Sequence, residues 1–463
     1  MTVAPASNIY SAEQFKLFSI TINAERYTRP VVLFSSSEAA PGGAAIEFNI
    51  FEHINQPFLT GNLIMMDDAD FYTAGDIQGT ERVTIEYGLP TDEAAPVTLN
   101  MILVNVERSI KTNDQTAILK FNLIQDLGWY DAISEYSKAY TGSGETIIEN
   151  IVKDKFNLPL NKRTTESQQG TFKYIVPYVT PSKAIKSVLN KMTTQNGLPY
   201  FFFSTVGSNS FILKDMETIF QEESFNKDQP FVYSQATTNQ ATDITGQIRS
   251  IHNYEGNDLE DTLMLAAEGA IGSEYNYMNI TTGQMYTNTV DATSIVRDLV
   301  NYNIISREES VPMVDYNFIP DPSGTDPRTV NQYPARHFFQ IAAENYPNDT
   351  GVNSYSQETH FSDAQLRVNK YAMLRHLAKN IYTIYLPGLL FLTGNEKTSV
   401  GSKISIQVLR NAIVEDPSSQ NLIDQKRSGE FLIMAKRHIF DVQGGIHNVS
   451  MDVARMTYTE VDQ

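Results

Sequence analysis

Alternation of apolar and polar residues with a period of two dominates the first quarter of the chain. Between Phe15 and Asp126, short runs rich in Val, Ile, Phe and Thr are separated by turn residues, with no helical period between them. Such runs are typical of half-buried strands in compact antiparallel folds. The predicted strands include Val31–Phe34, Ile46–Phe51, Leu59–Met66, Arg82–Tyr87, Thr98–Val106 and Ala117–Ile124. We therefore expect a polar arm over residues 1–14 and a first antiparallel β-barrel or sandwich over residues 15–126.

Helical periodicity begins in the next segment, residues 127–215. Ser143 is placed to cap a helix over Glu145–Phe156, and Thr180 to cap a second helix whose first turn contains Pro181. After that helix, Tyr200–Phe203 and Phe211–Leu213 flank a Gly-Ser-Asn turn, which predicts a hairpin. This segment is expected to form a helix-and-hairpin domain.

The remaining half of the chain begins with a polar region of weak periodicity, residues 216–360, which contains an evident loop at Asp321–Pro327. We expect it to be irregular, with part of it contributing to a second barrel. A helix is then predicted from Ser362, where Gln365 completes a capping box. Alternation returns from Ile381 to Tyr458, so residues 361–463 are expected to form a helix and a second β-barrel.

Two segments of the chain are similar in type. Gly79–Ile85 and Gly401–Ile406 each consist of a glycine turn, a small hydroxyl residue, a charge and then alternation. Each precedes a long predicted hairpin: Ile102–Ser109 with Thr116–Ile124, and Glu430–Phe440 with His447–Met456. Chance similarity between β-rich segments is the alternative to duplication. The predicted fold class is α+β, mainly β, with two related antiparallel β-barrel domains and an inserted helix-hairpin and irregular middle region.

Composition excludes several classes of protein. The 463 residues include 35 Lys+Arg and 54 Asp+Glu, a net charge of −19, which makes a poor partner for bare nucleic acid. There is no cysteine, which removes disulfides, thiolate metal sites and cysteine nucleophiles and is compatible with a reducing compartment. The longest nearly uninterrupted apolar run, Tyr385–Leu392, is too short to span a membrane, and Met1–Tyr10 is not expected to be a leader.

The histidines give one candidate site. His53, His252, His337, His360, His376, His438 and His447 form no His-Glu-x-x-His motif. His438 and His447 are expected to face each other across the closing hairpin. A zinc pair is conceivable there, but a third or fourth ligand is not evident, and satisfied or surface histidines are the favoured interpretation.

Other candidate motifs favour structural roles. Neither Asp67–Asp70 nor Asp321–Asp326 has the ligand spacing of a calcium loop. Thr141–Glu145 precedes a helix but has no P-loop lysine, so a helix cap is expected. The aromatic run Tyr200–Phe203 lacks interleaved basic residues and is expected to be a buried strand rather than a base-stacking platform. We predict no catalytic, cofactor or metal site, and no enzyme activity.

Four segments carry a resemblance to a known family. In order, they are Phe51–Ile64; Gly144–Ile148 with Thr180–Asp215; the Ser362 helix leading into Val400–Ile404; and Ser428–Ile433 with its partner strand Val449–Met456. In this order they resemble the baseplate (tail) hub proteins of contractile-tailed bacteriophages. The resemblance covers about two thirds of the chain, and Gly256–Pro347 matches no part of it.

The resemblance implies a non-enzymatic, structural virion protein with two torus-type barrels per subunit. Such hubs are homotrimers whose six barrels adapt a threefold spike to the sixfold tail tube and conduct DNA at genome ejection. Partners implied are the spike, tail tube or tube-initiator proteins and baseplate wedge proteins, with DNA only in transit. Assembly is expected in the host bacterial cytoplasm. We also expect the spike to be a separate protein, Gly144–Asp215 to contact it, and the lumen of the ring to be acidic.

Two other functions are compatible with the sequence. One is a tail-associated cell-wall hydrolase whose paired carboxylates meet only in the folded chain. The other is a different tail-tip or tube-initiating adaptor ring with a single barrel. Peptidoglycan lysis would identify the first, and a hexamer in solution would favour the second.

Overall fold

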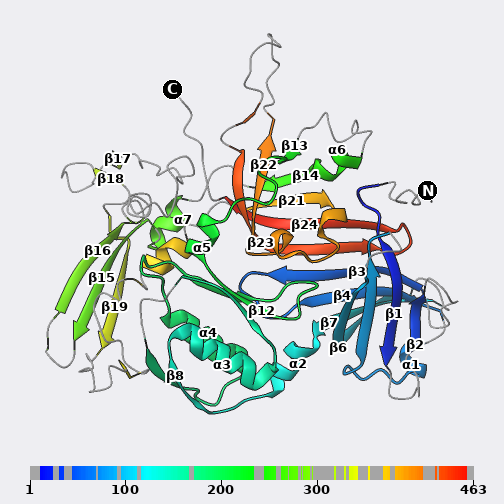
Figure 1. The fold of residues 1–463 in the computed structure, drawn as a ribbon, viewed down its shortest axis with the longest axis horizontal. Helices are drawn as coiled ribbons and strands as arrows, with labels where there is room; N and C mark the ends of the chain where they lie inside the picture. The colour runs from blue at the N-terminus through cyan, green and yellow to red at the C-terminus, as the bar shows by residue number, and fades with distance from the viewer. Residues whose placement is uncertain are drawn as a thin grey trace, which may run out of the picture.

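The computed structural model contains two β-rich units joined in one sheet, a helical domain below them and a small separate sheet (Figure 1). This confirms the predicted mainly β, α+β fold. The structure describes residues 11–23, 31–35, 44–68, 71–90, 95–111, 116–165, 171–233, 244–256, 262–269, 271–279, 283, 285–291, 295, 318–319, 328–329, 333–342, 353–354, 366, 369–375, 381–409, 423–424 and 427–455.

The first unit is the β region predicted near the N-terminus. Buried and partly exposed side chains alternate along its strands, because one face of the sheet packs on a core and the other is open. Its elements are β1 (Lys16–Asn23), β2 (Val31–Ser35), β3 (Ala44–His53), β4 (Thr60–Asp67), the short helix α1 (Phe71–Ala74), β5 (Arg82–Gly88), β6 (Val97–Lys111) and β7 (Ala117–Gln125). Each pair of neighbouring strands is antiparallel.

The second unit is assembled from distant parts of the sequence. Its elements are β13 (Phe231–Tyr233), β14 (Asn253–Gly256), β21 (Ile381–Pro387), the 3-10 turns η3 (Leu389–Phe391) and η4 (Glu396–Thr398), β22 (Lys403–Val408), β23 (Gly429–Asp441) and β24 (Ile446–Arg455). The predicted closing hairpin is β23 and β24, which pair from Phe431–Arg455 to Asp441–Ile446. β13 and β14 come from the middle region of the sequence.

The two units form one continuous sheet of 13 strands, because β23 pairs with β24 and also with β3. In Figure 1 the red strand β23 lies beside the blue strand β3. We call this β23–β3 pairing the internal seam. Phe440 of β23 stacks on Phe48 of β3 with ring centroids 4.2 Å apart, so the core of the first unit includes a side chain of the second.

The helical domain follows β7 and has its own core. The expected helices are confirmed: α3 (Gly144–Phe156) is capped by Ser143, and α4 (Pro181–Lys191) by Thr180. The predicted hairpin is also confirmed as β11 (Tyr200–Phe203) and β12 (Phe211–Asp215). The other elements are α2 (Asp126–Ile133), β8 (Ala139–Gly142), β9 (Leu160–Arg163), β10 (Phe172–Ile175) and α5 (Met216–Gln221).

The middle region contains regular structure that the sequence pattern did not reveal. β15 (Gly272–Asn279) lies between β16 (Met285–Asp291) and β19 (Arg336–Ala342), apart from the large sheet. Further elements are α6 (Ile244–Arg249), α7 (Thr262–Ala267), β17 (Phe318–Ile319), β18 (Arg328–Thr329) and β20 (Asn353–Ser354). Residues 369–375 are helical, while Ser362, Gln365 and the Asp321–Pro327 loop lie outside the described residues.

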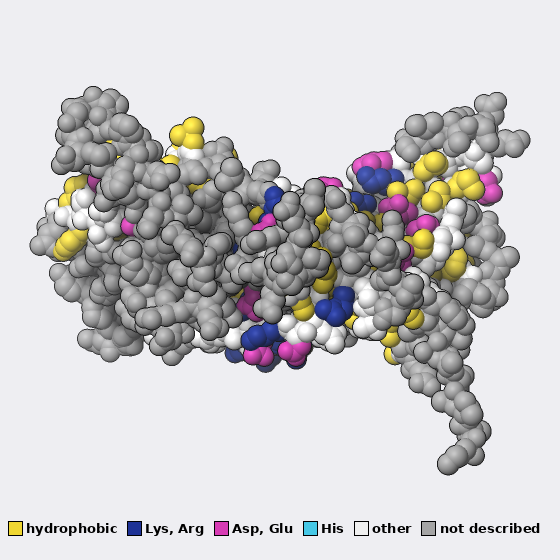
Figure 2. All heavy atoms as spheres, turned by 90° about the horizontal axis from the view of Figure 1, so that it is seen from above, with side chains coloured by type: hydrophobic (Ala, Val, Ile, Leu, Met, Phe, Trp, Pro, Cys, Tyr) yellow, Lys and Arg dark blue, Asp and Glu magenta, His cyan; other side chains and the backbone are white. Residues whose placement is uncertain are grey.

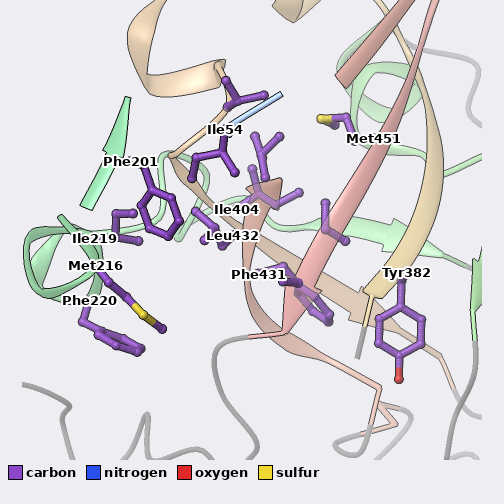
Figure 3. Packing of buried hydrophobic residues seen from close by; sticks show 14 of the residues in the cluster. Ile54, Phe201, Met216, Ile219, Phe220, Tyr382, Ile404, Phe431, Leu432 and Met451 are labelled. Atoms are coloured by element: carbon purple, nitrogen blue, oxygen red, sulfur yellow. The ribbon is translucent and has the colours of Figure 1, made fainter. Parts of the chain in front are cut away.

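The core of the second unit joins three parts of the chain. Figure 3 shows Phe201 of the hairpin and Met216, Ile219 and Phe220 of α5 packed toward Ile404, Phe431 and Leu432 of the second unit. Burial of these large side chains fixes the helical domain against the second unit. The buried strand expected at Tyr200–Phe203 is thereby confirmed.

Candidate assembly interface

The two units share an order of strands. Five strands of the first unit lie in the order β3-β4-β7-β6-β5, and five of the second in the order β14-β21-β24-β23-β22. Every neighbouring pair within each series is antiparallel. The series end differently, because β1 is antiparallel to β5 whereas β13 is parallel to β22. The units therefore have related topologies that diverge at one edge.

A shared β-bulge aligns the units residue by residue. The β6–β7 register shifts between Leu103 and Asn105, and the β23–β24 register shifts between Ile433 and Ala435. Just before each bulge a backbone amide bonds back to the preceding turn, Leu103 N to Glu81 O at 2.9 Å and Ile433 N to Ser402 O at 3.0 Å. A bulge is a specific backbone feature, so its recurrence with the same hydrogen bond supports duplication.

This alignment corrects the sequence comparison by one residue. The strand registers place Arg82 and Lys403 in equivalent positions, opposite Ile102 and Leu432. Gly401 then corresponds to Thr80 and not to Gly79. Both glycines have positive φ, 99° and 79°, so each turn uses a left-handed residue but at neighbouring positions.

The internal seam contains four fully buried polar side chains. Glu52 of β3 lies directly opposite Lys436 of β23, with Oε2 and Nζ 3.3 Å apart. His438 Nε2 is 3.4 Å from Glu52 Oε1, and His438 Nδ1 is 3.0 Å from His447 Nε2 on β24. We call these four residues the seam cluster.

Other backbone segments complete the seam cluster. The Val206 amide donates to Glu52 Oε1 at 3.1 Å, and Lys436 Nζ donates to the Thr398 carbonyl at 3.2 Å. Val206 follows the β11 strand and Thr398 ends η4. The cluster thus ties the hairpin and the loops of the second unit to the junction of the two units.

Burial and mutual charge set the protonation of the seam cluster. Burial raises the pKa of Glu52, but the Lys436 ammonium, His438 and the Val206 amide together lower it to about 2. Burial lowers the pKa of Lys436, and the neighbouring Glu52 carboxylate offsets part of this decrease. Burial and the Lys436 charge lower the pKa of His438, and burial lowers the pKa of His447 still further. The cluster is therefore an ion pair with two neutral imidazoles near neutral pH.

The facing pair His438 and His447, expected from the hairpin pattern, is confirmed. The rings are parallel within 2° and their nitrogens are at direct hydrogen-bond distance, an arrangement suited to one shared proton rather than to a metal between them. Sequence reasoning missed Glu52 and Lys436. The alternation along β23 could have identified Lys436 as inward-facing. It lies in phase with Phe440 and, once the bulge is allowed for, with Ile433.

The other candidate motifs are dispersed. His53, His252 and His337 lie on separate strands or loops, with His252 and His337 near Glu13 and Glu274. Asp67 caps α1 by accepting from the Phe71 amide at 2.8 Å. Asp70, Asp321–Asp326, His360 and His376 lie outside the described residues.

Among the described residues, no group of three acidic or histidine side chains could hold a metal ion. The helices in the described part of the chain are too short or too polar to cross a membrane.

The two units differ in whether the edge used in the internal seam has a strand partner. In the second unit, residues 435–441 of β23 pair with β3; in the first unit, the equivalent edge of β6, residues 105–111, has no strand partner among the described residues. Likewise β3 has partners on both sides, whereas its equivalent β14 pairs only with β21 in the described part of the chain. Within the described part of the chain, one edge of each kind is therefore open.

Side-chain exposure agrees with this difference. Val104, in the β6 bulge, is 45% exposed. Its equivalent Met434 is partly buried and packs on the core of the second unit, and the Met434 carbonyl accepts from the Ile54 amide at 2.9 Å. An apolar side chain is thus exposed in the first unit where the internal seam covers its counterpart.

Comparison with known proteins gives a match in structure alone. The chain matches no protein-family model and no curated protein sequence. It is similar to the 43 kDa tail protein of prophage MuSo2 from Shewanella oneidensis, with a TM-score of 0.50 and 10% identity over 94% of this chain and 98% of that one. A tail protein from Neisseria meningitidis MC58 gives a TM-score of 0.47 and 9% identity over 95% and 96%. The chain therefore has the fold of the MuSo2 tail protein along nearly its whole length, which confirms at the level of fold the predicted resemblance to phage tail proteins.

Proposed function

We propose that this protein is the structural hub of a phage tail baseplate, a trimeric ring that joins a threefold spike to a sixfold tail tube and conducts DNA at ejection. The observation that carries the proposal is the pair of open edges, β6 and β14, in a chain whose own duplicated strands already form the equivalent pairing once. Its fold, like that of the MuSo2 tail protein, is compatible with a structural role in the tail.

The internal seam serves as a template for the contact between subunits. The strand equivalent to β23 is β6, and the strand equivalent to β3 is β14. In the contact between subunits, β6 of one copy would therefore pair with β14 of the next. Applying the seam register across copies places Ser109, equivalent to Ile439, opposite Glu255, equivalent to Asn49. Edge strands with unpaired backbone groups pair readily with another chain. Repeating the contact gives a head-to-tail arrangement, which closes into a ring when the rotation allows it.

The ring would contain two kinds of seam. Three internal seams and three seams between subunits alternate around three copies, so six similar units surround one axis. We propose that residues 15–126 provide one unit, and that residues 361–463 with β13 and β14 provide the other. The spike, tail tube or tube initiator and wedge proteins would be the partners, in a non-enzymatic virion component assembled in the bacterial cytoplasm.

Disulfide trapping tests the contact directly, because the natural chain contains no cysteine. A Ser109→Cys/Glu255→Cys double variant should give covalent trimers after oxidation, since paired strands bring Cα atoms within disulfide range. Size-exclusion chromatography with light scattering should give three times 52.0 kDa. The variant should also be co-expressed with a spike protein, so that the proposed partner is present while the ring assembles.

Two further variants control the trapping. Asn49→Cys/Ile439→Cys occupies the equivalent positions of the internal seam and should cross-link within one chain. Ser109→Cys/Tyr254→Cys moves one cysteine to the opposite face of β14 and should give no cross-linked trimer. Equal cross-linking of both Ser109 variants, or a hexamer without disulfide trimers, would overturn the proposal.

A further inference from the structure

On the open face of the large sheet, a row of asparagines crosses the first unit, with Asn105 exposed, Asn62 and Asn122 partly buried and Asn49 buried. Asn49, Asn62, Asn122 and Asn105 are successive Cα partners across β3, β4, β7 and β6. Asn49 Nδ2 donates to Asn62 Oδ1 at 2.8 Å, and Asn122 Nδ2 donates to Asn105 Oδ1 at 2.6 Å. We call these four residues the amide row. Their amides bond in two pairs, and Asn49 and Asn122 also donate to Glu47 and Glu107.

The equivalent row in the second unit is acidic. The strand registers align Asn49 with Glu255, Asn62 with Thr383, Asn122 with Asp452 and Asn105 with Ala435. Thr383 Oγ1 donates to Asp452 at 2.8 Å. Two carboxylates therefore occupy positions where the first unit has two carboxamides.

Basic side chains near the rows are matched by acidic ones. Lys120 Nζ lies 3.1 Å from Glu107, and Arg437 bonds to Asn49 and lies 3.7 Å from Glu47. Neither Glu255 nor Asp452 forms an ion pair with a Lys or Arg among the described residues. Figure 2 shows several of the described basic side chains beside acidic ones.

From these positions we infer that the open face of the sheet is a wall past which double-stranded DNA moves without adhering, with a neutral sector from the first unit and an acidic sector from the second. This inference rests on the proposed function, which gives the face a channel to line. DNA binds proteins by exchanging condensed counterions for Lys and Arg. A neutral amide sector offers no such exchange, and an acidic sector repels the phosphates. In a ring of three copies, the wall would have six similar sectors but a threefold alternation of charge.

Charge reversal on the acidic row tests the inference. We would measure binding of a short DNA duplex by fluorescence anisotropy for the natural chain and for Glu255→Lys/Asp452→Lys, at about 50 and 200 mM salt. The natural chain should show no binding that depends on salt. The reversed variant should bind at least about tenfold tighter at the lower salt, with affinity falling as salt rises. Glu255→Gln/Asp452→Asn, which copies the amide row, should bind no better than the natural chain.

A matched control separates the face from net charge. Glu223→Lys/Asp228→Lys makes the same change in charge at exposed positions outside the large sheet and should leave DNA binding unchanged. Equal binding by the control and the reversed variant, or tight binding by the natural chain, would overturn the inference. Light scattering on the same samples reports the trimer. A monomer would contradict the proposed function, while the comparison of variants would still decide the inference because the face is open on a single chain.

Discussion

His438 of β23 and His447 of β24 share a hydrogen bond of 3.0 Å between Nδ1 and Nε2, although neither ring is exposed to solvent. One of the two nitrogens must lack a proton for this bond to form. The pair also lies beside Lys436, so a further positive charge there would be both buried and repelled. The bond between these two residues makes the internal seam depend on neutral imidazoles.

Acidification should therefore destabilise the protein in two stages that begin at different pH values. The pKa values of both histidines are lower in the folded chain than the unfolded value of about 6.5, so their stabilisation is present above pH 6.5 and is lost as pH falls below it. Each contributes up to about 1.4 kcal/mol per pH unit. The lowered pKa of Glu52 adds a second loss between pH 4.5 and about 2.

Urea unfolding at several pH values measures these losses. His438→Gln/His447→Gln should flatten the slope below pH 6.5 and leave the loss that Glu52 adds below pH 4.5. Equal slopes for the natural chain and this variant between pH 6.5 and 5 would show that the pair does not control stability there.

Removing one partner of the Glu52–Lys436 pair should be more harmful than removing both. Lys436→Met leaves the Glu52 carboxylate buried without its counter-ion, and a loss of about 3–5 kcal/mol in the free energy of unfolding is expected. Glu52→Gln/Lys436→Met should recover much of that loss. A double-mutant cycle from chemical unfolding measures the coupling, and additive losses would contradict a direct interaction.

Lys370 should hold the C-terminal end of α4 in place. Its ammonium donates to the carbonyls of Leu189, Asn190 and Met192 at 2.8–3.0 Å, at the helix end where the regular backbone bonds stop. Lys370→Met should lower the free energy of unfolding by about 1–3 kcal/mol and increase amide hydrogen exchange near Met192. Lys183→Met, on the exposed side of the same helix, is the control and should change neither measurement.

Two glycines with nearly the same backbone angle separate conformational strain from steric contact. Gly394 and Gly445 have φ of +63° and +64°, but a Cβ at Gly394 would lie 1.9 Å from the Val206 carbonyl oxygen, whereas one at Gly445 meets nothing within 4 Å. Gly445→Ala should cost about 1 kcal/mol through the left-handed backbone alone. Gly394→Ala should cost clearly more, because the Val206 loop must move. Thermal unfolding compares the two, and equal losses would contradict the close approach.

Local signals in the sequence were sufficient for the elements that depend on neighbouring residues. The caps Ser143 and Thr180, the hairpin at Tyr200–Phe203 and the closing hairpin with its facing histidines each follow from short-range patterns, and all are confirmed. The duplication was also visible, although its alignment at Gly79 and Gly401 was one residue out, because a bulge changes register without changing composition.

Long-range pairing was not predictable in the same way. Nothing near β14 identifies β21 as its partner, since more than a hundred residues lie between them, and the polar sequence of β15 and β16 hides their strands. Glu52 and Lys436 read as ordinary charged residues until β3 and β23 are placed side by side. The candidate interface was therefore beyond sequence reasoning, because it depends on which edges remain without partners.

The alignment of the two units also shows where the second unit contains a long insertion relative to the first. The end of β3 and the short turn to β4, residues 51–59, correspond to the whole stretch from 257 to 380 between β14 and β21. Because the entropic cost of closing a loop rises only slowly with its length, a hairpin tip tolerates a very large insertion while the paired strands keep their register. The small sheet of β15, β16 and β19 is thus an appendage of one hairpin, and relatives could exchange or lose it without redesigning the framework from which it projects.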